Sequence, residues 1–377
     1  MRVRRCNIRS RVVQRQRMSP TWLSCGGLTN FESLRRRQTC PASILLSGNC
    51  NEKAASEIMP LNVAKAGPET NAVALLTPTY ARDVELCALL CESVDRHVGA
   101  FSKHYLLVPD CDLLLFSRFE SERRSVLPAS RFLPGWLRPL PPIVQRKRRQ
   151  YWWSFRAMPV SGWHVQQILK IAATIALPHR RYCILDSDVV FFRDFDLSRY
   201  EYPGSIPLLS IPGKVTANQP GHARWVETSH RLLGLPAPTL PAADYIGHII
   251  FWDQQATRAM AAKLEAASNL DWIDALCRTR EFSEYMLYGY FVQNDASFAG
   301  RHTPSLRTGC VSYWDPPRLD KAELNRLLRG ADQDDVAFSA ASFSGTPVQM
   351  IRAAIEETRA QLRPRAATKQ TAGLGAC

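Results

Sequence analysis

Short continuous apolar runs alternate along this chain with longer segments in which apolar residues recur at helical spacing. The runs at 72–76, 105–108 and 181–185 show no polar alternation, which is typical of strands buried on both faces. The segments 83–97 and 162–177 place apolar residues three and four positions apart, which predicts amphipathic helices. The order strand, helix, strand predicts an α/β fold with a mostly parallel sheet flanked by helices.

Weaker patterns continue this fold toward the C-terminus. They predict strands at 206–209, 249–252, 308–314 and 336–343, and helices at 222–233, 253–267, 281–292 and 346–361. The stretch 117–160 is different, because it is rich in Arg, Pro and Trp, and we expect a long surface excursion or lid there. We therefore expect one domain over 71–360.

The net charge of +14 belongs mainly to the two ends of the chain. Residues 1–60 hold eleven Lys or Arg and three acids, and residues 358–377 hold four basic residues and no acid. Basic arms without interleaved aromatic residues favour a disordered leader over 1–70 and a disordered tail over 361–377, with no specific nucleic-acid partner. The alternative is a non-catalytic protein that binds anions through these arms.

The eleven cysteines form no CxxC motif and no cluster with metal-ligand spacing. Their number is odd, and the N-terminus lacks the apolar region of a secretory signal, so we expect reduced thiols in a cytoplasmic protein. No apolar run approaches the roughly 18 residues that a spanning helix needs. Peripheral contact with the inner face of a membrane stays open.

Candidate chemistry gathers where the strand at 181–185 ends. That strand runs directly into Asp186, Ser187 and Asp188, and a second apolar run follows. In an open α/β sheet, ligands bind at the carboxyl ends of the strands. Two carboxylates there supply the oxygen ligands that Mg²⁺ or Mn²⁺ prefers, and such an ion suits a diphosphate. If the strand stays regular, the two carboxylates share one face; the alternative is a turn, because Asp-Ser-Asp favours turns.

Two stretches together resemble the GT-A nucleotide-sugar glycosyltransferases. They are 181–192 (RYCILDSDVVFF) and 74–83 (ALLTPTYARD). The chain is most similar to a bacterial GT-A-like group known mainly as a domain of unknown function, whose pattern is echoed at 163–167, 281–290 and 342–347. The resemblance covers about residues 70–360 and implies a GT-A-like domain.

This resemblance implies a metal-dependent transferase that moves a sugar from a nucleotide-diphosphate donor to a hydroxyl of a glycan, lipid or small-molecule acceptor. Asp186 and Asp188 would hold Mn²⁺ or Mg²⁺, with Ser187 beside the donor and His302 as a further ligand. The nucleotide would lie on Asp110 and on the loop after the first strand, which supplies Thr77, Pro78, Thr79, Tyr80 and Asp83. The alternatives are a plain strand-to-helix turn in that loop and a surface histidine at 302.

Polar residues on two predicted helices complete the candidate site. Trp163, Gln167 and Lys170 open the helix before the DSD strand, and Lys170 would meet a phosphate; the alternative is a solvated polar face. Glu281 and Glu284 open the helix at 281–292, and each is a candidate general base for the acceptor hydroxyl. The alternative is that acids simply favour helix N-termini.

The same DSD stretch also fits the motif of haloacid-dehalogenase-type phosphatases. There the first aspartate, Asp186, would be the nucleophile toward phosphate, and Ser210 and Lys214 would be later motif residues. That motif normally follows the first strand of its domain, whereas here a βαβ unit precedes it. The sequence therefore favours the transferase, and it leaves open the donor sugar, the acceptor, the stereochemistry and the oligomeric state.

Overall fold

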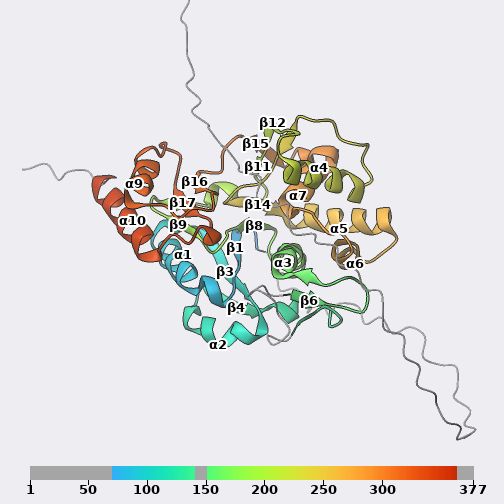
Figure 1. Ribbon diagram of the computed structural model, residues 1–377, viewed down its shortest axis with the longest axis horizontal. Coiled ribbons are helices and arrows are strands. Elements are labelled where there is room, and N and C mark those ends of the chain that lie inside the picture. The colour runs from blue at the N-terminus through green and yellow to red at the C-terminus, as the bar shows by residue number, and fades with distance from the viewer. Residues whose placement is uncertain (1–69, 141–150, 363–377) are drawn as a thin grey trace, which may run out of the picture. The chain divides into compact units, whose positions relative to one another are not determined.

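In the computed structural model, which describes residues 70–140 and 151–362, the three apolar runs predicted as strands pair side by side in one sheet (Figure 1). Its five strands run in the order β14 (Ile250–Asp253), β8 (Arg181–Ile184), β1 (Val73–Pro78), β3 (Phe101–Val108) and β4 (Arg124–Pro128). All neighbours are parallel except β14, which runs antiparallel to β8. The prediction of an α/β fold with a mostly parallel sheet is confirmed. The predicted leader before Thr70 and the tail after Leu362 lie outside the described residues.

Alternate residues of β1 face different helices. Ala74 and Leu76 pack in the cluster that contains α3 (Gly162–Ala176), whereas Val73 and Leu75 pack in the cluster that contains α1 (Val84–His97). Figure 1 shows these helices on opposite sides of the sheet. Because both faces of the strand are covered, its sequence is continuously apolar instead of alternating.

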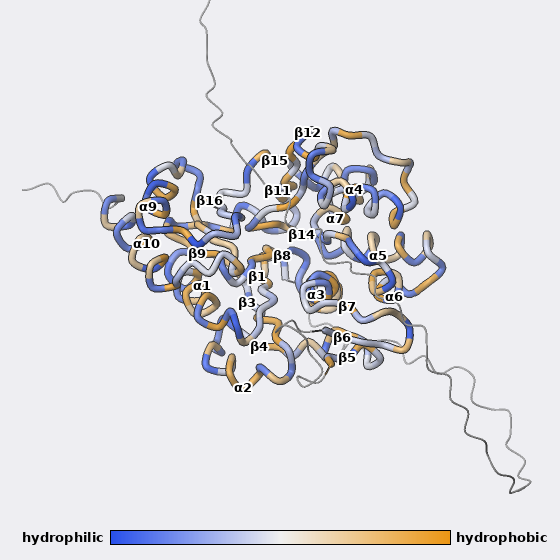
Figure 2. Tube along the Cα trace, in the orientation of Figure 1, coloured by the Kyte–Doolittle hydropathy of each residue, from blue (hydrophilic) through white to orange (hydrophobic). Residues whose placement is uncertain are grey.

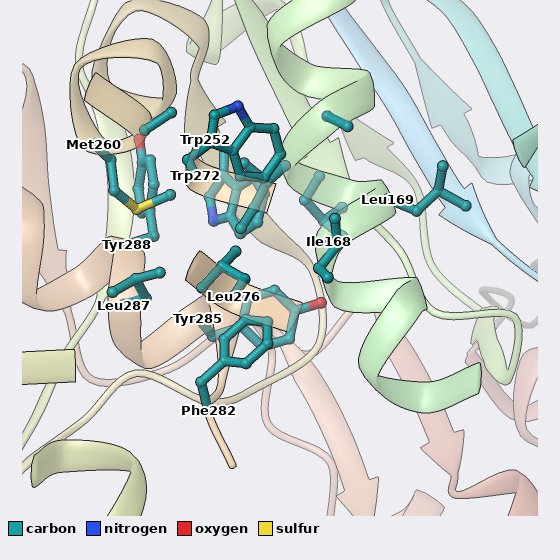
Figure 3. Packing of buried hydrophobic residues seen from close by; sticks show 14 of the residues in the cluster. Ile168, Leu169, Trp252, Met260, Trp272, Leu276, Phe282, Tyr285, Leu287 and Tyr288 are labelled. Atoms are coloured by element: carbon teal, nitrogen blue, oxygen red, sulfur yellow. The ribbon is translucent and has the colours of Figure 1, made fainter. Parts of the chain in front are cut away.

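The larger core lies on the α3 side of the sheet. It also receives residues of α5 (Gln254–Ser268), α6 (Trp272–Cys277) and α7 (Glu284–Asn294). Figure 3 shows Ile168 of α3 facing a group of aromatic rings that includes Trp252 and Tyr285. Along the helices, hydrophobic residues recur with hydrophilic ones between them, as Figure 2 shows, which is the pattern expected of helices that cover a core.

A second, three-stranded sheet joins the first through the DSD turn. It consists of β16 (Cys310–Tyr313), β17 (Ala337–Ala340) and β9 (Val189–Phe191), in that order. α9 (Lys321–Arg329) and α10 (Val348–Leu362) supply residues that pack with Val190 and Phe338. The apolar run after Asp188 is therefore a strand of a different sheet from the run before Asp186.

The expected surface excursion at 117–160 is wrong for Arg124–Pro128, which form the edge strand β4. The Arg124 side chain is buried and donates to Asp95, at 2.6 Å, and to His104. Arginine is usually exposed, so a segment that begins with Arg124 is not predicted from the sequence to be a buried strand. Trp152 is also buried, and residues 141–150 of this stretch lie outside the described residues.

Shorter elements complete the described chain. Further strands are β2 (Val98–Gly99), β5 (Arg138–Pro139), β6 (Tyr151–Trp153), β7 (Val160–Ser161), β10 (Phe195–Asp196), β11 (Ile206–Leu209), β12 (Ile211–Val215), β13 (Ala242–Asp244) and β15 (His302–Ser305). Further helices are α2 (Leu113–Phe116), α4 (Pro220–Leu232) and α8 (Ala296–Ala299). The cysteines of the described ranges are all free thiols, and no helix there is long and apolar enough to cross a membrane.

Candidate functional site

The residues Asp186, Ser187 and Asp188 form a turn that carries the chain from β8 into β9. The backbone N–H of Val189 donates to the carbonyl oxygen of Asp186 at 3.2 Å. The strand therefore does not stay regular, and the two carboxylates do not share one strand face. Asp186 contacts α3, and Asp188 contacts the end of β17.

A buried lysine holds Asp186. Lys170 of α3 donates to Oδ1 of Asp186 at 2.9 Å, to Oε1 of Glu284 at 2.9 Å and to the hydroxyl of Tyr285 at 2.8 Å. Burial raises the pKa of Asp186, but the Lys170 ammonium and His248 outweigh it, and the net pKa lies below its ordinary value. The arrangement keeps Asp186 ionised and ties α3, α7 and the DSD turn together.

Asp188 accepts hydrogen bonds from the segment that follows β17. The hydroxyl of Ser339 donates to its Oδ1 at 3.1 Å, and the backbone N–H of Ser342 donates to its Oδ2 at 3.0 Å. Burial is the main cause of a raised pKa of Asp188, and the neighbouring Asp186 carboxylate also raises it. The segment 339–342, which lies more than 150 residues away in the sequence, is therefore part of the site.

A histidine that sequence reasoning missed faces Asp186. Because β14 runs antiparallel to β8 with Ile250 opposite Ile184, continuing this register places His248 opposite Asp186. Its Nδ1 lies 3.6 Å from Oδ2 of Asp186, and its ring stacks on Trp314 at 4.4 Å. His248 is 1% exposed, and within the described ranges neither ring nitrogen has a hydrogen-bond partner. An unpartnered buried imidazole beside a carboxylate is an arrangement that a bound ligand would complete.

Some residues of the loop after β1 line a pocket with a volume of about 190 Å³. Tyr80 and Asp83 line it together with Arg82 and Phe343, and Ser342 connects it to Asp188. Burial, and next the Asp188 carboxylate, raise the pKa of Asp83 to about 6, while Ser187 lowers it by hydrogen bonding. The pocket thus opens beside the DSD turn.

The other residues of this loop have structural contacts. The hydroxyl of Thr77 pairs with Nε2 of His104 at 3.1 Å within the sheet, Thr79 is buried, and Pro78 ends β1. Asp110, at the end of β3, is exposed and accepts from the backbone N–H of Ser130 at 3.2 Å. The fold brings Asp83 to Ser187 and Asp188 of the DSD turn. The hydrogen bonds of Thr77 and Asp110 described above join them to His104 and Ser130 instead.

Trp163, Gln167 and Lys170 lie in α3, the predicted helix, at spacings of four and three residues. Gln167 and Lys170 are buried, so this is not a solvated polar face. The side chain of Gln167 accepts from the backbone N–H of Glu284 at 3.1 Å, which places the start of α7 beside α3. Ser283 caps α7, so Glu281 precedes the helix; it is exposed and pairs with Arg224 of α4. Of the two predicted bases, the structure therefore connects Glu284 to Asp186 through Lys170.

His302 is placed in a different role from the predicted one. Its Nε2 pairs with the hydroxyl of Tyr288 at 2.8 Å, and its Nδ1 pairs with the carbonyl oxygen of Phe298 at 2.9 Å. Both ring nitrogens are thus used to join β15 to α7 and α8, and no nitrogen is left for a metal. His248 is the histidine that faces Asp186.

Residues 58–361 match the model of a family of unknown function, DUF6492. The chain belongs to this family. No curated protein matches the chain.

The metal prediction for this DUF6492 protein stays a prediction. Within residues 70–140 and 151–362, no group of three or more His, Cys, Asp or Glu side chains is arranged to hold a metal ion. Asp83, Asp186, Asp188 and His248 nevertheless converge at the edge where β1 and β8 end and β14 begins.

Proposed function

We propose that this chain is a metal-dependent glycosyltransferase with a GT-A-like fold, which moves a sugar from a nucleoside-diphosphate donor to a hydroxyl acceptor. The observation that carries the proposal is the convergence of three carboxylates and an unpartnered histidine beside a pocket at the ligand-binding edge of the sheet. The resemblance of the DSD stretch to GT-A enzymes supports it.

The chemistry of the site suits a divalent cation. Lys170 compensates Asp186, but Asp83 and Asp188 have raised pKa values, chiefly from burial and also from repulsion among the carboxylates. Carboxylate oxygens and an imidazole nitrogen form a donor set that suits Mn²⁺. Asp186, Asp188 and His248 do not form a ready three-ligand group within the described ranges, so they would hold the ion only after turning from their present contacts. A bound cation would then stabilise the negative charge on the leaving diphosphate.

The pocket beside the DSD turn suits a nucleotide. Tyr80 and Phe343 line it with aromatic rings on which a base would stack, and Phe343 is 62% exposed. Arg82 lies in the same lining and supplies positive charge for a phosphate. We place the base and phosphates of the donor here.

The phosphatase alternative finds less support. Lys214 lies 3.3 Å from Asp244, so it is not the cation at Asp186, where Lys170 lies instead. The backbone N–H of Ser210 donates to the carbonyl oxygen of Ser305 at 2.8 Å, which fixes Ser210 directly after the β11–β15 pair. A phosphatase would still release phosphate from a generic phosphomonoester with Mg²⁺, and the transferase would not.

Nucleotide binding tests the proposal. UDP, GDP, ADP, CDP and dTDP are screened for thermal stabilisation with and without Mn²⁺, and calorimetry follows on the best ligand. We expect one diphosphate to bind only with Mn²⁺, and Asp186→Asn and Asp188→Asn to abolish this binding. The exposed Asp334→Asn is the matched control and should bind as the wild type does. Undiminished binding in both DSD variants would contradict the metal–diphosphate site.

The general base is tested separately. Glu284→Gln and Glu281→Gln are compared for donor affinity and for turnover with the sugar nucleotide found in the screen. The variant that loses turnover while keeping donor affinity identifies the base. Glu284 is buried against Lys170, whereas Glu281 is exposed. If both variants keep their turnover, neither glutamate is the general base.

A further inference from the structure

A second polar cluster lies outside the DSD site, around the buried Asp244 at the end of β13. Asp244 is 1% exposed, and its Oδ1 accepts from the backbone N–H of Ile246 at 3.0 Å. Its Oδ2 lies 3.3 Å from Nζ of Lys214 and 3.6 Å from Nδ1 of His222. Among the described residues, neither this oxygen nor that nitrogen has a hydrogen-bond partner. Asp244 is therefore ion-paired with Lys214, but its Oδ2 makes no hydrogen bond of good geometry to a described residue, and a ligand hydroxyl would supply one.

A row of aromatic rings extends from this cluster to the surface. The ring of His222 lies 4.9 Å from that of Trp225, and Trp225 lies 6.0 Å from Trp163. Trp163, in the first turn of α3, is 53% exposed, whereas Trp225 is partly buried. A largely exposed indole backed by a second indole is a flat apolar surface beside hydrogen-bonding groups.

The row is connected to the DSD site by two independent paths. Along α3, Trp163 and Lys170 are seven residues apart on one helix face, which corresponds to about 10 Å along the axis. Along the chain, Asp244 and His248 are four positions apart, a span of at most about 14 Å. Lys170 and His248 both contact Asp186. The row therefore begins within about 10 to 14 Å of residues that contact Asp186.

We infer that Trp163, Trp225, His222 and Asp244 form a subsite for a pyranose ring beside the proposed transfer site. The apolar face of a sugar would stack on Trp163, and its hydroxyls would bond to the Asp244 carboxylate and the His222 imidazole. A ring held there belongs either to the acceptor glycan or to the sugar of the donor. The inference rests on the proposed function for its place in the reaction, but the binding of a sugar can be measured without it.

Saturation-transfer NMR with methyl glycosides of glucose, galactose, mannose and N-acetylglucosamine tests the subsite. We expect at least one to bind the full-length wild type, and Trp163→Ala to weaken that binding about tenfold. Asp244→Asn should also weaken glycoside binding. If the Asp244→Asn variant does not fold, His222→Gln replaces it as the test of the polar side of the subsite. Phe155→Ala removes an aromatic ring that is 90% exposed and packs on Trp153, so it is the control and should bind normally.

The results separate the two proposals. Glycoside binding that fails to respond to Trp163→Ala and His222→Gln, or the absence of any binding, overturns the subsite whatever the nucleotide screen shows. Glycoside binding lost in these variants supports the subsite even if no nucleotide binds. Competition by a sugar nucleotide but not by its nucleoside diphosphate assigns the subsite to the donor sugar, and binding beside both assigns it to the acceptor.

Discussion

The ammonium of Lys170 lies 2.9 Å from a carboxylate oxygen of Asp186, and the lysine is almost completely buried. The pair links the helix that precedes β8 to the turn that follows it. Since Lys170 also contacts Glu284, one cation compensates two carboxylates from different elements. A cation in this position orients the first aspartate of the DSD turn and keeps it charged.

Replacing Lys170 with Met should strongly destabilise the fold. The substitution leaves Glu284 buried without a cation, and breaking a buried pair in this way costs about 3–5 kcal/mol of unfolding free energy. Urea denaturation followed by fluorescence measures it. Lys321→Met breaks the exposed pair with Glu357 and is the control, for which we expect no measurable change. Equal stability of the two variants would contradict the assigned role of Lys170.

The stability of the metal-free protein should decrease as the pH rises through about 6, because of Asp83. The pKa of this carboxyl is raised from 3.8 to about 6, so the folded state binds the proton more tightly than the unfolded state between these values. Asp83→Asn should therefore stabilise the protein at pH 7.5 by at most about 3 kcal/mol, and by less at pH 4.5. Denaturation at the two pH values measures this, with the exposed Glu85→Gln as control. A gain of the same size at both pH values would show that ionisation of the buried Asp83 carboxyl is not the cause.

The two histidines His248 and His302 should respond in opposite ways to substitution by Gln. His248→Gln should weaken Mn²⁺-dependent nucleotide binding about tenfold, which corresponds to about 1.4 kcal/mol. His302→Gln should lower the unfolding free energy by about 1–2 kcal/mol through its lost hydrogen bonds, without changing Mn²⁺-dependent binding. Calorimetry and denaturation on both variants measure these effects. If only the His302 variant showed reduced Mn²⁺ dependence, His302 and not His248 would be the histidine ligand, as the sequence resemblance implies.

Gly289 of α7 should not tolerate a side chain. A Cβ there would lie 2.2 Å from the ring of Tyr245, which follows Asp244 in the loop that leads to His248. Overpacking of this kind costs about 3 kcal/mol, and Gly289→Ala should also weaken the binding of ligands at that loop. Gly300→Ala is the control, because a Cβ at Gly300 would meet nothing within 4 Å. Denaturation measures the cost, and similar values for the two variants would show that Tyr245 can move away.

Several features of the fold follow from local pattern alone. The strands β1, β3 and β8 and the helices α1 and α3 were predicted, because a strand covered on both faces is continuously apolar and an amphipathic helix repeats every three to four residues. The edge strand β4 and the helix α9 were not. The helix α9 was missed although its sequence carries a signal, because Asp320 and Glu323 form a capping box and Leu324 and Leu328 recur at helical spacing. Arg124 in β4, in contrast, is buried by pairing with Asp95. Pairing between distant side chains is not visible as a period.

At the candidate site, the sequence by itself determined that Asp186 and Asp188 follow a buried strand and that Lys170 precedes it on an apolar helix. Only the tertiary structure decided which groups meet these carboxylates. The register of the antiparallel strand β14 brings His248 to Asp186, and the end of β17 brings Ser342 to Asp188. Strand register and the packing of one sheet against another are set by contacts across the whole chain, so residue types and spacing near Asp186 do not contain them.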